Sequence, residues 1–373
     1  MNKGAESDAL HARVRACIRA FERGEPAPEA FDAIAADLAR FQATHVPGYA
    51  RLCAARGVDP ARVRRAGDAP AVPTDAFKLA PVFAFDASEA AVTFRTSGTT
   101  IGARGAHPMR RTDTYDAAAL AFGRAMLARD LGGSAAPVVL VLGPSPQEAP
   151  DSSLAHMCGL FARALAAAPE PAERTYFVRG GALAMAGLRA RVGDLAGGPP
   201  VLLLATSFAL VHLLDALAGE VLPLPPRSRV MQTGGTKGKS REIAADELRR
   251  EVARTFAVGE RAVIGEYGMT ELSSQLWEAT LVDPAARHGV YVEPPWSRVI
   301  PVTPDTLVPV ADGETGIARI EDLANVDSAF AVATQDRVRR VAGGIELLGR
   351  APGAVPRGCS IAIDEMLGGE GVP

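Results

Sequence analysis

The sequence has little of what marks membrane, secreted or nucleic-acid-binding proteins. No apolar run reaches the ~18 residues of a membrane span, and no apolar segment follows the N-terminal basic residue as in a signal peptide. Aromatic residues are scarce at 5%, and the formal net charge is −3, so neither base stacking nor electrostatics favours a nucleic-acid partner. The four cysteines form no C-x-x-C pair and show no metal-ligand spacing. These absences predict a soluble, cytoplasmic protein whose thiols are free.

The pattern that is present predicts a large α/β protein. Apolar residues recur at helical spacing near the N-terminus, which predicts a helical cap over residues 1–75. Helical patterns then alternate with four short apolar runs, at residues 137–143, 199–206, 229–235 and 261–268. This alternation predicts a mostly parallel sheet with helices on both faces and ligands beyond the carboxyl ends of its strands. Proline-rich short runs after about residue 290 predict a small antiparallel, barrel-like unit that completes a core over 76–349, followed by a short tail over 350–373.

Four short stretches carry the residues with chemistry. RTSGTTIGARG (95–105) groups hydroxyls and glycines whose donors suit phosphate oxygens. QTGGTKGKS (232–240) ends like a Walker A loop but has Thr233 where that motif needs glycine, which argues against a P-loop enzyme. GEYGMTE (265–271) offers a ring, a hydroxyl and a carboxylate suited to Mg²⁺, and Asp336 and Arg350 suit a ribose. Each stretch alone is also compatible with an ordinary loop or surface charge.

In this order the stretches resemble the motif series of the adenylate-forming superfamily, over about residues 94–350. That superfamily includes acyl-CoA synthetases, peptide-synthetase adenylation domains and luciferases. The resemblance implies the large α/β adenylate-forming domain and the use of ATP and Mg²⁺.

The resemblance also implies a role for each matching residue. The first stretch would clamp the phosphates of ATP with Thr96, Ser97, Gly98, Thr99 and Thr100. The adenine would lie among Gly234, Gly235, Thr236, Tyr267 and Gly268, with the tyrosine ring stacked on it. Thr270 would contact the α-phosphate, Glu271 would bind Mg²⁺, and Asp336 and Arg350 would hold the ribose.

Two features depart from the superfamily pattern. Arg104 stands in the phosphate loop where members usually have lysine, which keeps the charge but changes the geometry. Only 23 residues follow Arg350 and none is a lysine, whereas most members continue into a mobile C-terminal domain with a catalytic lysine. The tail thus resembles a truncated C-terminal domain. Arg104, Lys237 or Lys239 could supply the missing charge; a slow reaction or help from a partner are the other interpretations.

The N-terminal helices, VPTDAFKL (72–79), QTGGTKGKS and RGCS (357–360) together resemble the LuxE-type acyl-protein synthetases. This resemblance implies that a fatty acid is activated as acyl-AMP, transferred to Cys359 as a thioester and delivered to an acyl reductase partner. A thiolate is a good acceptor for an acyl-adenylate, and Arg357 is expected to lower the pKa of the Cys359 thiol. A homo-oligomer is a further possible assembly.

Two rival functions stay open on the sequence. A ligase similar to the phenylacetate–CoA ligases would pass the acyl group to CoA or a carrier protein. A non-catalytic nucleotide-binding subunit would scaffold a reductase complex. The acyl chain length is not fixed by the sequence. Cys17 and Cys158 lie on apolar helical patterns and are expected in the core, and His212 is expected to pack in its helix.

Overall fold

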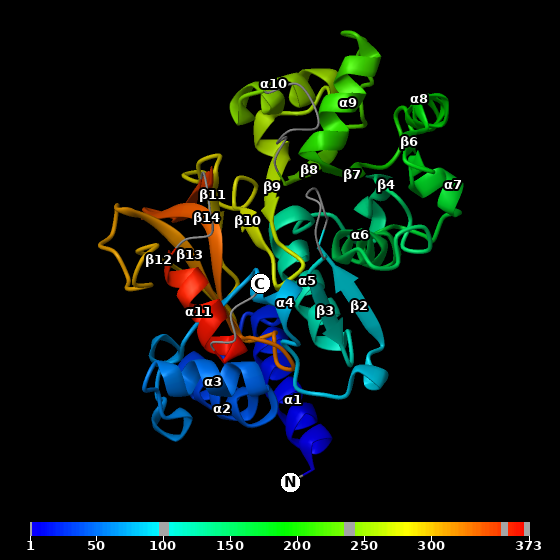
Figure 1. The fold of residues 1–373 in the computed structure, drawn as a ribbon. Coiled ribbons are helices and arrows are strands. Elements are labelled where there is room, and N and C mark those ends of the chain that lie inside the picture. The colour runs from blue at the N-terminus through cyan, green and yellow to red at the C-terminus, as the bar shows by residue number, and fades with distance from the viewer. Residues whose placement is uncertain (1, 97–103, 235–242, 352–356, 369–373) are drawn as a thin grey trace. The chain divides into compact units, whose positions relative to one another are not determined.

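The computed structural model describes residues 2–96, 104–234, 243–351 and 357–368 (Figure 1). Its contacts divide the chain into two compact units. The first unit comprises Met1–Ala121, Met269–Gln275 and Glu293–Pro373, and the second comprises Phe122–Gly268 and Leu276–Val292. The third motif, GEYGMTE, therefore passes from the second unit into the first between Gly268 and Met269.

The first unit begins with three helices, as the sequence predicts. They are α1 (Lys3–Glu22), α2 (Phe31–His45) and α3 (Pro47–Ala55). The side chain of Asn2 caps α1 by accepting a hydrogen bond from the amide of Gly4, and Pro47 occupies the first turn of α3, where it leaves no amide unsatisfied. Their apolar stripes are buried, including Val14, Ile18 and Leu38. The boundary of the cap at residue 75 stays a prediction.

An antiparallel sheet forms the second part of this unit and confirms the predicted change of pattern after residue 290. Its strands pair in the order β12 (Ser297–Val302), β13 (Thr315–Asp322), β14 (Ala331–Val341) and β15 (Gly344–Arg350). Short β1 (Val72–Pro73) adds to β14 in parallel. The remaining elements are α4 (Ala76–Leu79), the hairpin of β2 (Val92–Arg95) and β3 (Ala106–Met109), and α11 (Arg357–Leu367). Figure 1 shows α11 alongside α3.

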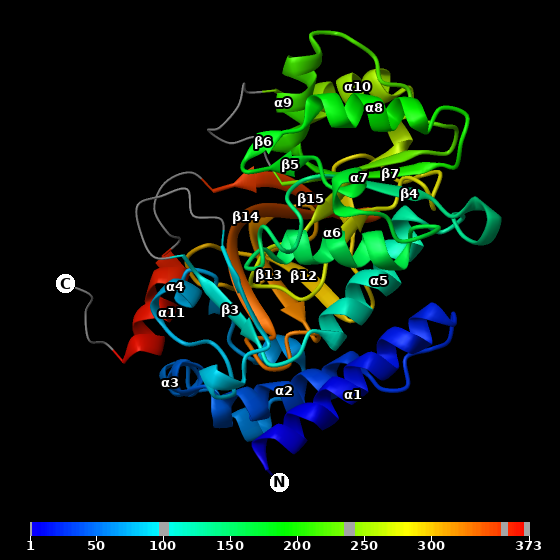
Figure 2. The same cartoon turned by 90° about the vertical axis from the view of Figure 1, so that its right-hand side faces the viewer.

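The second unit is the predicted parallel sheet with its helices (Figure 2). Parallel strands run in the order β4 (Val138–Leu142), β7 (Val201–Thr206), β8 (Arg229–Thr233) and β9 (Val263–Tyr267). Antiparallel β10 (Leu276–Glu278) and β11 (Val290–Val292) extend it beyond β9. The helices are α6 (Ser153–Ala164), α7 (Ala172–Thr175), α8 (Met185–Asp194), α9 (Ser207–Leu217) and α10 (Ala245–Phe256), with the hairpin of β5 (Val178–Arg179) and β6 (Ala182–Leu183). Helix α5 (Asp113–Leu127) begins in the first unit and ends in the second.

The two faces of the parallel sheet have different neighbours. Paired residues of adjacent parallel strands point to the same face, so Leu203 and Val230 share a face, and they belong to the core cluster that includes residues of α9 and α10. Residues of the opposite face, among them Leu204 and Met231, border a cavity that residues of α6 also line. The strands are apolar on both faces, as buried parallel strands require. Within the described ranges, no helix has the length and apolar character needed to cross a membrane.

Candidate functional site

A β-hairpin in the first unit carries the predicted phosphate loop. Strands β2 and β3 pair up to Arg95 and Ala106, and the amide of Thr96 then donates to the carbonyl of Gly105 at 3.0 Å. The amide of Gly105 donates in return to Oγ1 of Thr96 at 2.9 Å. The loop itself, with Ser97, Gly98, Thr99 and Thr100, lies outside the described residues. The hairpin thus fixes both ends of the loop.

Arg104 is directed back onto this hairpin. Its Nε donates to the carbonyl of Thr96 at 2.7 Å and its Nη2 to the carbonyl of Arg95 at 3.2 Å. The planar guanidinium therefore helps to close the base of the loop. The sequence did not predict this contact; it predicts only that Arg104 supplies positive charge to a phosphate.

His107 connects the hairpin to the third motif. Its Nδ1 lies 2.7 Å from the carbonyl oxygen of Thr270, which can only accept, so Nδ1 carries the proton and donates. Burial lowers the pKa of His107 to about 4, so the ring is neutral near neutral pH. Sequence reasoning missed this residue because nothing in the sequence links it to a motif 163 positions away. It orients the backbone on which Thr270 and Glu271 lie.

Glu271 is a buried carboxyl, with 7% of the residue exposed. Burial raises its pKa to about 7, and the charge of Asp75 adds to this rise, whereas the positive charges of Lys78 and Arg350 oppose it. A buried carboxylate whose charge is poorly compensated fits a divalent cation. No group of three or more metal-ligating side chains occurs among the residues that the structure describes. Such a cation would take few ligands from the protein, as Mg²⁺ does when phosphate and water supply the rest.

Asp336 and Arg350 lie directly opposite each other on β14 and β15. Nε of Arg350 is 3.8 Å from Oδ1 of Asp336. The amide of Asp336 donates to Oγ1 of Thr334 at 3.0 Å, and this hydrogen bond fixes the backbone from which the Asp336 carboxylate extends. The structure brings these two predicted residues together and places the charge of Arg350 within electrostatic reach of Glu271. Their role toward a ribose stays a prediction.

The second unit holds the other predicted nucleotide residues. Gly234 follows β8 with a φ of 69°, a conformation that favours glycine, and its carbonyl accepts from the hydroxyl of Ser207 at 2.6 Å. Tyr267 ends β9, and its ring meets that of Tyr291 edge to face with centroids 6.4 Å apart. Gly268 is exposed at the next position. Gly235, Thr236, Lys237 and Lys239 lie outside the described residues.

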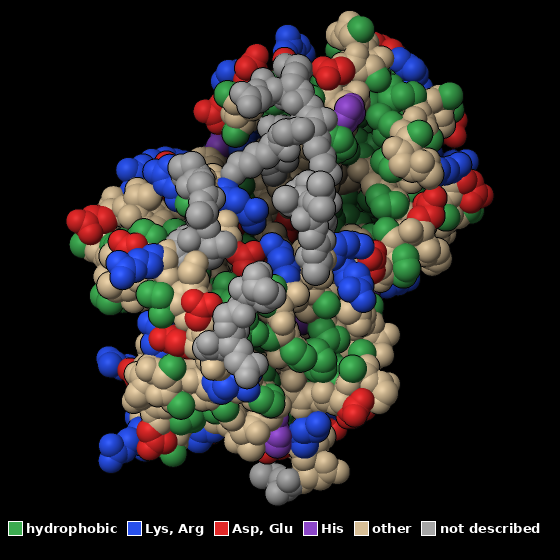
Figure 3. Space-filling view, in the orientation of Figure 1, with side chains coloured by type: hydrophobic (Ala, Val, Ile, Leu, Met, Phe, Trp, Pro, Cys, Tyr) green, Lys and Arg blue, Asp and Glu red, His purple; other side chains and the backbone are tan. Residues whose placement is uncertain are grey.

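A large apolar cavity lies in the second unit, at the carboxyl ends of β4 and β7. Its volume is about 530 Å³, within the range of small-molecule sites. Strand and helix residues form its buried walls: Val141, Leu204, Met231, Ala155 and Cys158. None of the described residues that line it is Lys, Arg, Asp or Glu. Figure 3 shows hydrophobic side chains gathered on the surface near α9 and the β5–β6 hairpin.

Cys158 and His212 both line this cavity. Cys158 is buried, as the sequence predicts. His212 is exposed, and its ring packs edge-on against Phe208 with centroids 4.4 Å apart. The sequence therefore predicts correctly that Cys158 is buried, but it does not predict the cavity. The spacing of apolar residues along a helix shows which face is buried, not whether the space beside that face is filled by other side chains.

Cys359 lies on α11 and is buried, with 1% of the residue exposed. Burial raises the pKa of its thiol to about 11, assisted by the charge of Asp75 and opposed by that of Arg56. The lowered pKa that the sequence predicts for this thiol is wrong, because burial raises it. Helix α11 is held on α3 by Nε of Arg56, which is 2.6 Å from Oε2 of Glu365.

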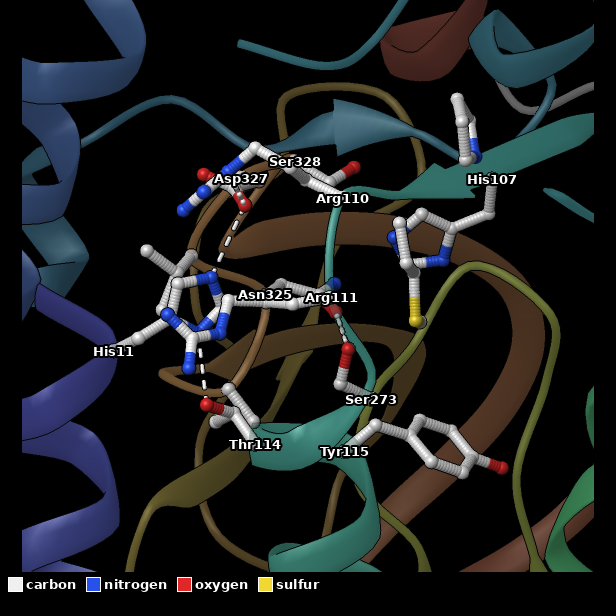
Figure 4. Close-up of a pocket in the computed structure, with 14 residues that line it drawn as sticks. His11, His107, Arg110, Arg111, Thr114, Tyr115, Ser273, Asn325, Asp327 and Ser328 are labelled. Carbon is white, nitrogen blue, oxygen red and sulfur yellow. Dashed lines mark hydrogen bonds and ion pairs between the residues drawn. The ribbon is translucent and has the colours of Figure 1, made fainter. Parts of the chain in front are cut away.

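A second, much smaller cavity in the first unit measures about 20 Å³ (Figure 4). There His11 points toward Asp327 and Thr114, with 3.0 Å from Nε2 to Oδ2 and 2.8 Å from Nδ1 to Oγ1. Ser7 donates to the same carboxylate of Asp327. The space holds no more than a water molecule, so this network serves to attach α1 to its neighbours.

Comparisons with known proteins identify the fold. No protein-family model and no curated protein matches the sequence. Among solved structures, 2-hydroxyisobutyryl-CoA ligase in its postadenylation state with R3-HIB-AMP superposes with a TM-score of 0.60 at 15% identity, over 86% of this chain and 67% of the ligase. The same ligase with 2-HIB-AMP and CoA gives 0.59 at 16% identity, over 94% and 69%. The chain has the fold of this ligase. The predicted fold class is confirmed.

The likeness to the ligase is one of shape, because the sequence identity is only 15–16%. ATP-bound MatB from Rhodopseudomonas palustris matches with a TM-score of 0.47 at 16% identity, over 72% of this chain and 49% of MatB. The chain spans about half of MatB and about two thirds of 2-hydroxyisobutyryl-CoA ligase.

Proposed function

We propose that the protein is an ATP-dependent ligase that activates a carboxylic acid as its acyl-adenylate. The supporting observation is the cluster in the first unit. The ends of the hydroxyl-rich loop, Glu271, Asp336 and Arg350 come from segments far apart in the sequence. Contacts connect them: His107 holds Thr270, Arg350 lies opposite Asp336, and Arg350 acts electrostatically on Glu271. Such a set of hydrogen-bond donors, two carboxylates and one cation suits a nucleoside triphosphate.

In the proposed reaction a carboxylate oxygen of the acid attacks the α-phosphorus of ATP. The new P–O bond forms as the bond to pyrophosphate breaks, and no proton is transferred. Thr96 to Thr100 donate hydrogen bonds to the phosphates, and Thr270 donates to the α-phosphate. Glu271 would hold Mg²⁺, which supplies charge neutralisation for the phosphates when bound. Asp336 and Arg350 orient the ribose, and Tyr267, Gly268 and Gly234 to Thr236 receive the adenine. Catalysis is then mostly positioning and electrostatics.

The acyl group of the acid occupies the cavity of the second unit. Its lining is apolar and, among the described residues, without charge, which suits an aliphatic chain better than a second carboxylate or an ammonium group. A fatty acid is therefore the proposed substrate class. The protein acts in the cytoplasm, with an acyl reductase or a second copy of the chain as its proposed partner.

The proposed acyl acceptor is Cys359. Its sulfur attacks the carbonyl carbon of the acyl-adenylate, the bond to AMP breaks, and the thiol proton passes to water. Because the thiol is buried with a raised pKa, this step requires α11 to leave its position on α3. The same burial favours a second candidate, in which CoA or a carrier protein takes the acyl group and Cys359 stays in the core.

Isotope exchange between ATP and pyrophosphate, measured over a panel of fatty and aromatic acids, tests adenylation. Absence of exchange with every acid, with candidate partners present, would support a non-catalytic nucleotide-binding subunit. Labelled acid then distinguishes the acceptors. Hydroxylamine-sensitive label on the wild type that is lost in Cys359→Ser and kept in Cys53→Ser supports acyl transfer to Cys359. CoA-dependent release of AMP without labelled protein supports the second candidate.

A further inference from the structure

Lys78 lies at the base of the phosphate hairpin, although none of the roles above uses it. It belongs to the short helix α4, which contacts β3. Its Cγ is 3.4 Å from the position that a Cβ would take on Gly105, the residue that closes the hairpin opposite Thr96. The aliphatic part of Lys78 therefore runs along the hairpin where the predicted phosphate loop begins and ends.

The ammonium group of Lys78 is also within electrostatic reach of Glu271. Its positive charge lowers the pKa of that carboxyl, as does the charge of Arg350. Lys78 thus lies against the hairpin through its aliphatic part and acts electrostatically on Glu271, the carboxylate proposed to hold Mg²⁺. All of these residues belong to the first unit.

Asp75 holds the ammonium group in this place. Its Oδ1 is 2.6 Å from Nζ of Lys78, and its carboxylate also accepts a hydrogen bond from Nε2 of the Gln335 side chain on β14. The side chain of Lys78 is 43% exposed, so the ion pair is in contact with solvent and contributes little to stability. An anion of higher charge can therefore replace Asp75 as the partner of Lys78 at little cost.

Arg104, the cation at the far end of the loop, differs from Lys78 in its contacts. Its guanidinium donates to two carbonyls of the hairpin backbone, Arg95 and Thr96. An ammonium group on a flexible stem can turn toward a new partner with its three donors, whereas a planar guanidinium in two backbone contacts is committed in direction. Of these two residues, Lys78 is therefore the better placed to follow the phosphates through the reaction.

We propose that Lys78 is a catalytic residue that binds the phosphates of ATP, and that Asp75 is its positioning residue. The inference rests on the proposed adenylation. As the carboxylate oxygen bonds to the α-phosphorus and the bond to pyrophosphate breaks, Lys78 stays protonated and donates hydrogen bonds to the phosphate oxygens that gain charge. Asp75 accepts the ammonium group again once pyrophosphate has left.

The first test is the kinetics of ATP–pyrophosphate exchange in Lys78→Ala, Lys78→Arg and Asp75→Asn. Loss of one preorganised donor predicts a fall in kcat of about 10²–10³-fold for Lys78→Ala, with the KM for the acid unchanged. Lys78→Arg is expected to restore part of the rate. Asp75→Asn should lower kcat less than Lys78→Ala does. Lys3→Ala, which removes the same charge from α1, should leave the exchange unchanged. Wild-type rates in Lys78→Ala would overturn the proposal.

The second test does not need turnover. Acetylation of Lys78 by an amine-reactive ester, followed by mass spectrometry, is expected to slow several-fold with Mg²⁺ and ATP, while acetylation of Lys3 stays unchanged. Protection of Lys78 without exchange activity for any acid would refute the proposed function and leave the phosphate contact intact. Exchange activity with an unprotected Lys78 would refute this inference and leave the proposed function intact. A loss of thermal stability equal in Lys78→Ala and Asp75→Asn, with normal exchange, would mark the pair as structural.

Discussion

Glu266 offers a stability test that depends on a single buried carboxyl. It lies on β9, opposite Thr233 of β8, and the hydroxyl of Thr233 donates to its carboxylate. The residue is 5% exposed, and burial raises its pKa to about 7 from an ordinary value of 4.5. Glu266→Gln keeps the size and the hydrogen-bond acceptor of the side chain but removes the charge.

The sign of the effect follows from proton linkage. The pKa of the folded state lies above that of the unfolded state, so the folded state binds more protons between pH 4.5 and 7. Stability therefore falls as the pH rises through this interval, and the penalty is fully present above it. At about 1.4 kcal/mol for each pH unit between the two values, the wild type loses about 3 kcal/mol by pH 8 and about 1 kcal/mol by pH 5. Glu266→Gln is free of this loss.

Urea unfolding of both proteins at pH 5, 6, 7 and 8 measures the difference. The free energy of unfolding of Glu266→Gln should exceed that of the wild type by a margin that grows by about 2 kcal/mol from pH 5 to pH 8. Glu260→Gln, an exposed carboxyl of the same unit, controls for the change in net charge. A difference that stays constant over this pH range would refute the reasoning.

Three further results are expected. Glu278 receives two hydrogen bonds of 2.9 Å from Arg249, and its pKa is lowered to about 2. The substitution Glu278→Gln should therefore lower the free energy of unfolding by about 3–5 kcal/mol at pH 7. Acid-unfolding curves should show this loss shrinking below pH 4.5. Alkylation of Cys359 at pH 8, followed by mass spectrometry, should be at least about 100-fold slower in the folded protein than in urea, because burial raises the pKa of the thiol to about 11; equal rates would contradict its position. Ala155→Phe, which adds a ring to the cavity wall, should lower ATP–pyrophosphate exchange about 10–100-fold for long fatty acids and leave short acids unaffected, whereas an equal loss for all acids would contradict the proposed acyl site.

The elements of the fold were largely predictable from the sequence. Each of the four apolar runs contains a strand of the parallel sheet, because a strand buried on both faces must be apolar throughout. The N-terminal helices followed from their apolar spacing, and the antiparallel strands after residue 290 from their prolines and short runs. The division into two units did not follow, because it depends on which segments pack together and not on their order in the chain.

The part of the candidate site that belongs to the sequence motifs was predictable from the sequence. The order of the motifs pointed to Glu271, Asp336 and Arg350. The structure pairs Asp336 with Arg350 across β14 and β15 and places Arg350 within electrostatic reach of Glu271. His107 and Lys78 were not found, because their importance comes from neighbours that are distant in sequence. The cavity was not found either, since an unfilled space leaves no pattern of residues along the chain.

The sequence by itself determined the secondary structure and the chemical inventory of this protein. Local periodicity decides which segments are helices and strands, and the residue types decide that hydroxyls, a carboxylate and cations are available. Only the tertiary structure decided how these groups behave. The thiol of Cys359 has a raised pKa and the ring of His107 a lowered one because burial removes the water that would stabilise their charged forms, and burial is a property of the packed chain.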